Sequence, residues 1–187
     1  MSAEHADPDV ELMLRFQKGD GAAFETLVHR HTRAVLNLVY RYLGDASRAE
    51  DVAQDVFVKV YRARMKYEPK AKFSTWLYRI AVNHCLNEIR SRKSQPAVAA
   101  PINDLLEHPA AEDPDARLRQ TELREAVKAA IDALPENQRM AVILARYEDM
   151  SYDEIAETMG LSLEAVKSVL FRAKENLQRA LARFDKP

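Results

Sequence analysis

Residues 151–177 read SYDEIAETMGLSLEAVKSVLFRAKENL, and this stretch decides the fold of the C-terminal part of the chain. Ser151 and Glu154 have the spacing of a capping box, in which the serine side chain accepts from a backbone N–H and the glutamate reaches back. Gly160 permits the positive φ of a tight turn, and Ser162 is suited to cap the helix that follows. The stretch therefore predicts a helix-turn-helix.

The second helix of this unit has two chemically different faces. Apolar residues recur at helical spacing and predict an inward face: Val166, Val169, Leu170, Ala173 and Leu177. The residues left largely outward are rich in donors: Lys167, Ser168, Phe171, Arg172 and Lys174. Such donors can meet base edges and phosphates in a major groove. An ordinary helical hairpin is the alternative, but both caps, the turn glycine and the basic face agree in register, which favours DNA binding.

The composition is typical of an α-helical protein and offers few residues for a catalytic or metal-binding site. The chain has 187 residues, only 4 of them Gly, and the single Cys85 excludes disulfide frameworks and multi-cysteine metal sites. The five histidines form no metal-ligand spacing, and no glycine loop could cradle a phosphate. We therefore expect no enzyme activity, no metal and no cofactor. The lack of an apolar run of spanning length or of a signal-peptide core predicts a cytoplasmic protein without membrane insertion.

A proline-rich acidic segment divides the chain. Residues 94–115 (SQPAVAAPINDLLEHPAAEDPD) contain four prolines and no Lys or Arg, which prevents a continuous helix. We expect an all-α protein with two small helical domains, at residues 8–93 and 116–184, joined by this linker. In the first domain, Asp9, Asp20, Asp45 and Ser74 are expected to cap successive helices. In the second, Pro135 suits the first turn of the helix before the helix-turn-helix.

The net charge of −1 conceals two basic islands. Residues 64–93 hold eight Lys or Arg against two Asp or Glu, and residues 161–187 hold six against three. In the first island, Arg79, Asn83, Asn87 and Arg90 fall close together on one side of a helix, and cations beside aromatic rings suit single-stranded DNA. The rings themselves, Trp76 in particular, fit a core better than a stacking platform.

A further stripe lies on the helix expected after Asp45. Asp51, Gln54, Asp55 and Val58 fall at i, i+3, i+4 and i+7, opposite the apolar residues of the same helix. A solvated acidic face and a docking surface for a basic partner both fit this stripe. The neighbouring Phe57 and Tyr61 favour docking, because aromatic side chains are common interface anchors.

Taken together, these stretches resemble the extracytoplasmic-function (ECF) group of the sigma-70 family of bacterial transcription initiation factors. Residues 49–62 (AEDVAQDVFVKVYR) resemble the helix that binds the polymerase clamp. Residues 73–93 (FSTWLYRIAVNHCLNEIRSRK) resemble the segment that opens and reads the minus-ten element. Residues 134–144 (LPENQRMAVIL) and 152–177 resemble the reader of the minus-thirty-five element. The absence of a third domain between them is typical of this group.

The resemblance implies core RNA polymerase, promoter DNA in duplex and single-stranded form, and an anti-sigma factor as partners. It assigns polymerase docking to Asp51, Gln54, Asp55 and Val58. It implies that one base of the opened minus-ten strand is extruded beside the loop at 64–73. The residues that it places around this strand are Lys72, Ser74, Thr75, Arg79, Asn83, Asn87 and Arg90. It assigns minus-thirty-five recognition to the helix-turn-helix residues Ser162, Lys167, Ser168, Phe171 and Arg172, with Lys174 beside them. Housekeeping members carry adjacent tryptophans, whereas Trp76 is alone here, which implies less robust melting and stricter promoter choice.

Two other functions remain open on the residues alone. A DNA-binding regulator with an N-terminal sensing module would bind duplex DNA as a free chain and form no complex with core polymerase. A helical scaffold or anti-sigma-like adaptor would bind no DNA. The sequence favours neither, because a sensing module needs no second basic island and a scaffold gives Lys167 and Arg172 no role.

Overall fold

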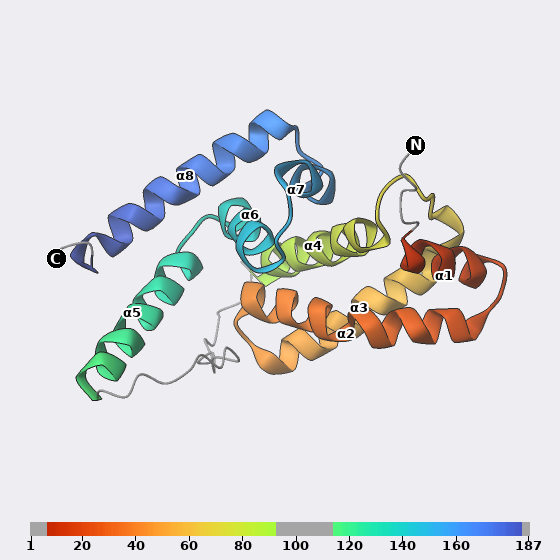
Figure 1. Cartoon of the computed structure of the whole chain (residues 1–187), viewed down its shortest axis with the longest axis horizontal. Helices are drawn as coiled ribbons and strands as arrows, with labels where there is room; N and C mark the ends of the chain where they lie inside the picture. The colour runs from red at the N-terminus through yellow and green to blue at the C-terminus, as the bar shows by residue number, and fades with distance from the viewer. Residues whose placement is uncertain (1–6, 93–113, 185–187) are drawn as a thin grey trace.

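The computed structural model describes residues 7–92 and 114–184, and these residues form helices joined by short turns without a β-strand, which confirms the all-α class. The helices, coloured along the chain in Figure 1, are α1 (Pro8–Gln17), α2 (Gly21–Leu43), α3 (Ala46–Ala63), α4 (Phe73–Arg92), α5 (Pro114–Asp132), α6 (Glu136–Tyr147), α7 (Tyr152–Met159) and α8 (Leu163–Leu181). Short 3₁₀ turns follow α3 (Arg64–Lys66) and α8 (Ala182–Phe184). Within the described ranges, no helix has the length and apolar character that crossing a membrane requires.

Helices α1 to α4 pack on one another, and we call them the N-terminal module. Asp20 and Asp45 cap α2 and α3 through hydrogen bonds from the Ala23 and Arg48 backbone N–H groups, as expected. Gly44 ends α2 in the left-handed conformation with a φ of 74°. The apolar stripe of each helix faces the shared core, so the polar stripes are left outside.

Two expected caps in this module are wrong. Asp7, and not Asp9, caps α1: its Oδ1 accepts from the Asp9 N–H at 3.0 Å. Its Oδ2 also accepts from the Phe73 N–H at 2.9 Å, so α4 begins at Phe73 and Ser74 lies inside that helix. The Asp9 carboxylate instead contacts Arg30 at 2.6 Å and His31 at 2.8 Å. The Asp7 carboxylate therefore serves the starts of both α1 and α4, which are far apart in the chain.

Helices α5 to α8 form the C-terminal module, in which α8 packs on α5, α6 and α7. Pro135 stands one residue before α6 as its N-cap, and not in its first turn as expected. Of the expected linker at 94–115, residues 94–113 lie outside the described residues, and Pro114 already begins α5.

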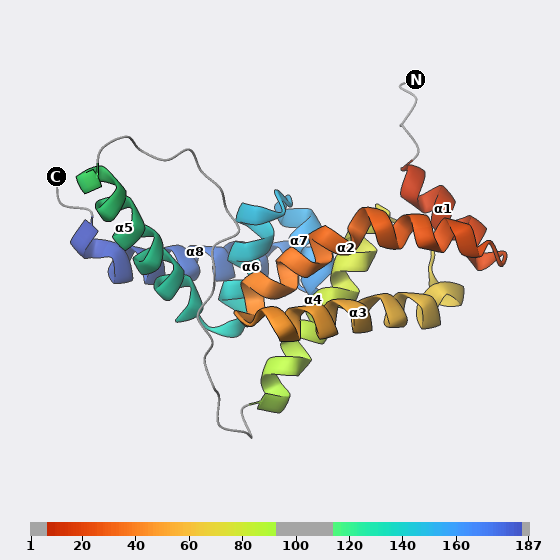
Figure 2. The same cartoon turned by 90° about the horizontal axis from the view of Figure 1, so that it is seen from below.

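The two modules lie against each other through α4 with α7 and α2 with α6. Figures 1 and 2 show α6 and α7 beside the N-terminal module from both directions, whereas α5 and most of α8 extend away from it. The basic helix α4 thus packs against α7, a contact that could not be predicted from the sequence of α4.

Candidate nucleic-acid and partner interfaces

The expected stripe on α3 is exposed along its whole length. Asp51, Gln54, Asp55 and Val58 all face solvent, and Val58 does so with 45% of its surface although it is apolar. The opposite face of α3 is buried, because Val52, Val56 and Val60 enter the core. The helix therefore separates a packed side from a side that two carboxylates make acidic.

An apolar groove runs beside this stripe, between α2 and α3. It encloses about 620 Å³ and its lining includes Phe24, Val28, Leu36, Phe57 and Tyr61. The two aromatic residues expected near the stripe differ: Phe57 is almost fully buried, whereas Tyr61 is 48% exposed. A partner helix could bind in the apolar groove and contact the acidic stripe at the same time, since amphipathic helices bind in grooves of this kind.

Helix α4 presents the expected polar face. Arg79, Asn83, Asn87 and Arg90 are exposed, whereas Leu77 on the other side is fully buried. Arginine and asparagine side chains on one helix face can hold phosphates and donate to base edges.

The N-terminal end of α4 is less accessible than the sequence suggests. Lys72 Nζ lies 2.8 Å from Glu154 Oε1 of the C-terminal module, Ser74 is half-buried and Thr75 is 2% exposed. Thr75 shares a helix face with the buried Tyr78 and Val82, three and seven residues further along. In this arrangement it therefore does not lie on the exposed face, contrary to the expectation that it surrounds DNA.

The aromatic rings near α4 pack on one another. Tyr67 and Trp76 meet edge to face with 4.9 Å between ring centroids, and Tyr67 and Phe73 at 6.1 Å. Burial raises the pKa of Tyr67 to about 12, and the nearby charge of Asp7 adds to this shift. The expectation that these rings serve the core is confirmed.

The helix-turn-helix forms as expected. The Glu154 N–H donates to Ser151 Oγ at 3.3 Å, and the Ser151 N–H donates to Glu154 Oε2 at 2.9 Å, so the capping box is complete. Gly160 has a φ of 65°, and Ser162 Oγ accepts from the Ala165 N–H at 3.2 Å. This turn fixes the direction of α8 relative to α7.

The outer face of α8 is a continuous donor surface. Val166 and Ala173 are fully buried and hold the helix on the module. The expected recognition residues are all exposed: Ser162, Lys167, Ser168, Phe171, Arg172 and Lys174. Phe171 is 62% exposed, which is unusual for a phenylalanine and leaves its ring available for contact with a thymine methyl group. Lys174 also borders an apolar groove that Leu123, Leu177 and Phe184 help to line.

A buried polar cluster joins the modules, and sequence reasoning missed it. The Tyr78 hydroxyl donates to Glu148 Oε2 at 2.6 Å, and Arg41 lies 3.6 Å from Glu148 Oε1. Burial and the hydrogen bond to Glu148 raise the pKa of Tyr78, and burial raises the pKa of Glu148 above its usual range. Tyr78 and Glu148 belong to no local motif, so no short-range signal could have paired them.

Comparison with known proteins places these surfaces in a family. A Sigma-70 region 2 model matches residues 27–95, and a model of Sigma-70, region 4 matches residues 124–182. The RNA polymerase sigma-H factor of Pseudomonas aeruginosa is 36% identical over 182 residues, covering 94% of each chain. The ECF RNA polymerase sigma-E factor of Escherichia coli is 38% identical over 174 residues, covering 89% of this chain and 91% of that protein.

Solved structures agree with this placement. CnrH in complex with the cytosolic domain of CnrY matches with a TM-score of 0.69 at 26% identity, over 96% of this chain and 100% of that chain. The sigma factor RpoE of Bartonella quintana in complex with the anti-sigma factor NepR matches with a TM-score of 0.62 at 25% identity, over 87% of this chain and 98% of that chain.

Proposed function

We propose that three surfaces of this chain, which belongs to the ECF group of the sigma-70 family of RNA polymerase sigma factors, divide the work of promoter recognition. Sigma factors are transcription initiation factors and not enzymes. In our proposal residues 8–93 dock on polymerase and engage the minus-ten element, residues 116–184 read the minus-thirty-five element, and residues 94–115 link them. The chain would act in the cytoplasm, where it meets core polymerase and chromosomal DNA.

Polymerase docking falls on the α3 stripe of Asp51, Gln54, Asp55 and Val58. The support is its exposure together with the adjoining apolar groove. A partner that carries basic side chains beside an apolar anchor complements both, and charge complementarity sets register and speeds association.

Minus-ten contact falls on the exposed face of α4, at Arg79, Asn83, Asn87 and Arg90. Two arginines hold the backbone of an opened strand while the amides between them donate to or accept from its bases. Lys72 would join this surface once its ion pair with Glu154 of α7 breaks. Ser74 is half-buried beside it, whereas the buried Thr75 lies on another face of the helix.

Minus-thirty-five recognition falls on Ser162, Lys167, Ser168, Phe171, Arg172 and Lys174 of the helix-turn-helix. Lys167 and Ser168 lie in the first half of α8, the part of a recognition helix that meets base edges in a major groove. Arg172 and Lys174 lie one to two turns further along, where phosphate contacts position the helix.

An anti-sigma factor is the expected regulator. Both solved structures described above are complexes with a partner protein, and in the Bartonella quintana structure a sigma factor is bound by a partner named an anti-sigma factor. We propose that this chain is held by such a partner in a way that covers its basic faces.

The observation that carries the proposal is the placement of two exposed basic faces and one exposed acidic stripe on three different helices of one chain. The test separates them. Asp55→Arg is expected to weaken binding to core polymerase and leave duplex contact by α8 intact. Lys167→Ala is expected to weaken minus-thirty-five recognition by about 1–3 kcal/mol if it contacts a base, and to leave polymerase binding intact.

The matched control is Glu175→Ala, which removes a charge from an exposed position on α8 outside the recognition set. Polymerase binding is measured by titration of labelled chain with core enzyme, and promoter recognition by titration of the assembled holoenzyme on duplex DNA. Equal damage to both activities by Asp55→Arg and by Lys167→Ala would refute the division of labour.

A further inference from the structure

We propose that the turn between α6 and α7 is an autoinhibitory latch: Glu148, bound by Tyr78 and Arg41 of the N-terminal module, holds α7 over the N-terminal end of the minus-ten helix until a partner separates the modules. This inference rests on the proposed function of α4. It adds a closed state of the free chain to the division of labour described above.

The latch centres on one carboxylate. Only 9% of the Glu148 side chain is exposed, and its two oxygens have different partners: Tyr78 Oη at 2.6 Å and Arg41 Nη1 at 3.6 Å. A buried carboxylate is costly unless it is hydrogen-bonded and paired. Both partners come from the other module, so the hydrogen bond and the ion pair of Glu148 exist only while the modules are in contact.

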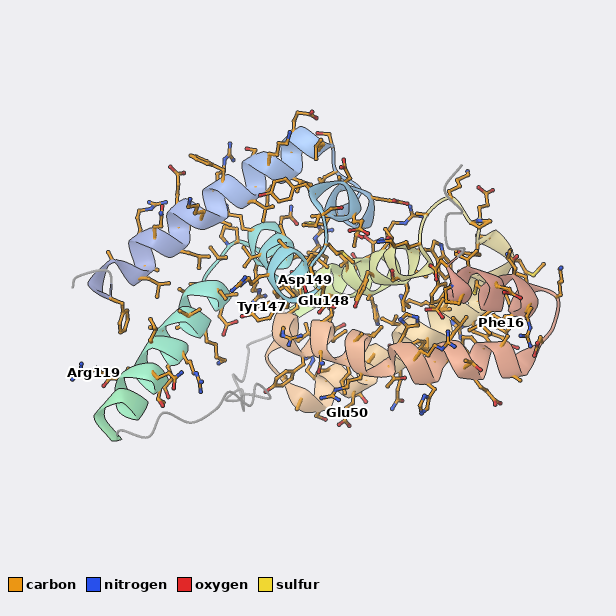
Figure 3. All side chains as sticks on the ribbon, viewed as in Figure 1. Phe16, Glu50, Arg119, Tyr147, Glu148 and Asp149 are labelled. Carbon is orange, nitrogen blue, oxygen red and sulfur yellow. The ribbon has the colours of Figure 1, made fainter. Side chains whose placement is uncertain are left out.

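The turn that carries Glu148 is itself held. The Arg41 guanidinium lies 4.6 Å from the centre of the Tyr147 ring, a cation–π contact with the residue before Glu148. Asp149 has a φ of 48°, and the Met150 N–H donates to the Leu144 carbonyl at 3.2 Å. Figure 3 shows Tyr147, Glu148 and Asp149 where the C-terminal module meets the N-terminal one, far from Phe16 at the other end of the molecule. These contacts hold the turn in a conformation in which the Glu148 carboxylate faces the N-terminal module.

A second contact lies where α7 begins. Lys72 Nζ is 2.8 Å from Oε1 of Glu154, the same glutamate whose Oε2 completes the capping box of α7. Lys72 is 67% exposed, so this ion pair adds little by itself. The ion pair does, however, occupy the ammonium group of Lys72, a cation of the proposed minus-ten set.

The closed form engages one end of α4 and leaves the other surfaces free. The α3 stripe, the outer face of α8 and the Arg79, Asn83, Asn87 and Arg90 face of α4 remain exposed, whereas α7 packs on α4 and holds Lys72 at its N-terminal end. Polymerase can therefore dock on α3 of the closed chain, and opening follows docking. If only a fraction of the molecules can bind DNA, the apparent Kd equals the intrinsic Kd divided by that fraction, so the measured affinity is lower.

The first test measures opening in the full-length free chain. Cysteines replace the exposed Glu11 and Ala180, one in each module, and carry spin labels for distance measurement. Cys85 is fully buried and stays unlabelled. We expect one narrow distance distribution for the labelled parent. Tyr78→Phe and Glu148→Ala, which each leave a buried polar group without its partner, are expected to give a longer and broader distribution.

Glu157→Ala is the matched control, because it removes an exposed carboxylate from α7 and should leave the narrow distribution unchanged. Amide exchange of Leu38 and Val39, both fully buried in α2, is recorded in parallel to show that the N-terminal module stays folded. Unchanged distances in Tyr78→Phe and Glu148→Ala overturn the latch. Unfolding of the module in Tyr78→Phe overturns it too, because the hydroxyl would then serve the fold of α4 and not the contact.

The second test adds core polymerase. If about 10% of the free chains are open, Glu148→Ala is expected to lower the half-saturating concentration for promoter binding in the presence of core by up to about tenfold. Core polymerase should also shift the parent to the long distances. An unchanged concentration for Glu148→Ala overturns autoinhibition even if the modules separate. Failure of the proposed function is distinguishable, because then no variant binds promoters with core while the distance measurement still reports the latch.

Discussion

At the scale of single residues, exposure separates side chains that are available from side chains that only look available in the sequence. Asn83 and Asn87 belong to the same helix as Thr75, yet the first two face solvent and Thr75 does not. Exposure of a residue on an amphipathic helix follows from spacing, and the α3 and α8 faces were predictable for that reason. Thr75 was not, because its identity suggests a polar surface while its position points into the core.

Cys85 provides a residue-scale prediction. It is fully buried in α4, and burial raises the pKa of its thiol to about 12. Because the thiolate is the reactive form, the folded chain is expected to resist a thiol-specific chromogenic reagent at neutral pH and to react only as it unfolds. A variant with Glu11→Cys serves as the reactive control. Immediate reaction of one thiol in the native parent chain would contradict the structure.

At the scale of elements, helix ends that depend on neighbouring residues were predictable and those that depend on distant ones were not. Four side chains cap their helices as expected, because each accepts from the backbone N–H three residues on: Asp20, Asp45, Ser151 and Ser162. The start of α4 depends on Asp7, 66 residues away, which no local rule contains.

Gly160 gives a prediction at this scale. Its φ is 65°, and a Cβ added there would meet nothing within 4 Å, so the cost of Gly160→Ala is conformational and not steric. We expect a loss of about 1–2 kcal/mol in the free energy of unfolding, measured with denaturant. Gly21→Ala is the control: it lies in the first turn of α2 with equally open space and no positive φ, and should be neutral or slightly stabilising. Equal effects of the two substitutions would argue against the turn geometry.

At the scale of the whole molecule, the distribution of charge over the surface matters more for DNA binding than the net charge. The net charge is −1, yet the exposed faces of α4 and α8 are basic. Promoter binding by the holoenzyme is therefore expected to weaken linearly in log–log form as salt rises. Arg172→Ala should reduce that slope by about one if it contacts a phosphate. Titrations at four or more salt concentrations measure the slope, and a salt-independent affinity would contradict an electrostatic grip.

The relation between the modules could not be predicted from the sequence. Prolines and a change of charge marked the break at 94–115, and helical periodicity gave the elements on both sides. The pairing of Tyr78 with Glu148 joins residues 70 positions apart and depends on burial that only tertiary structure creates. The fold was therefore predictable element by element, whereas the closed arrangement was not.

Transcription in a purified system tests the central claim most directly. Core RNA polymerase is supplied with fragmented genomic DNA of the source organism, with and without this chain, and new 5′ ends are mapped. The account predicts initiation at a limited set of sites that share two spaced elements, appearing only with the chain and lost in Asp55→Arg. No chain-dependent start site, or starts that persist in Asp55→Arg and in Lys167→Ala alike, would contradict it.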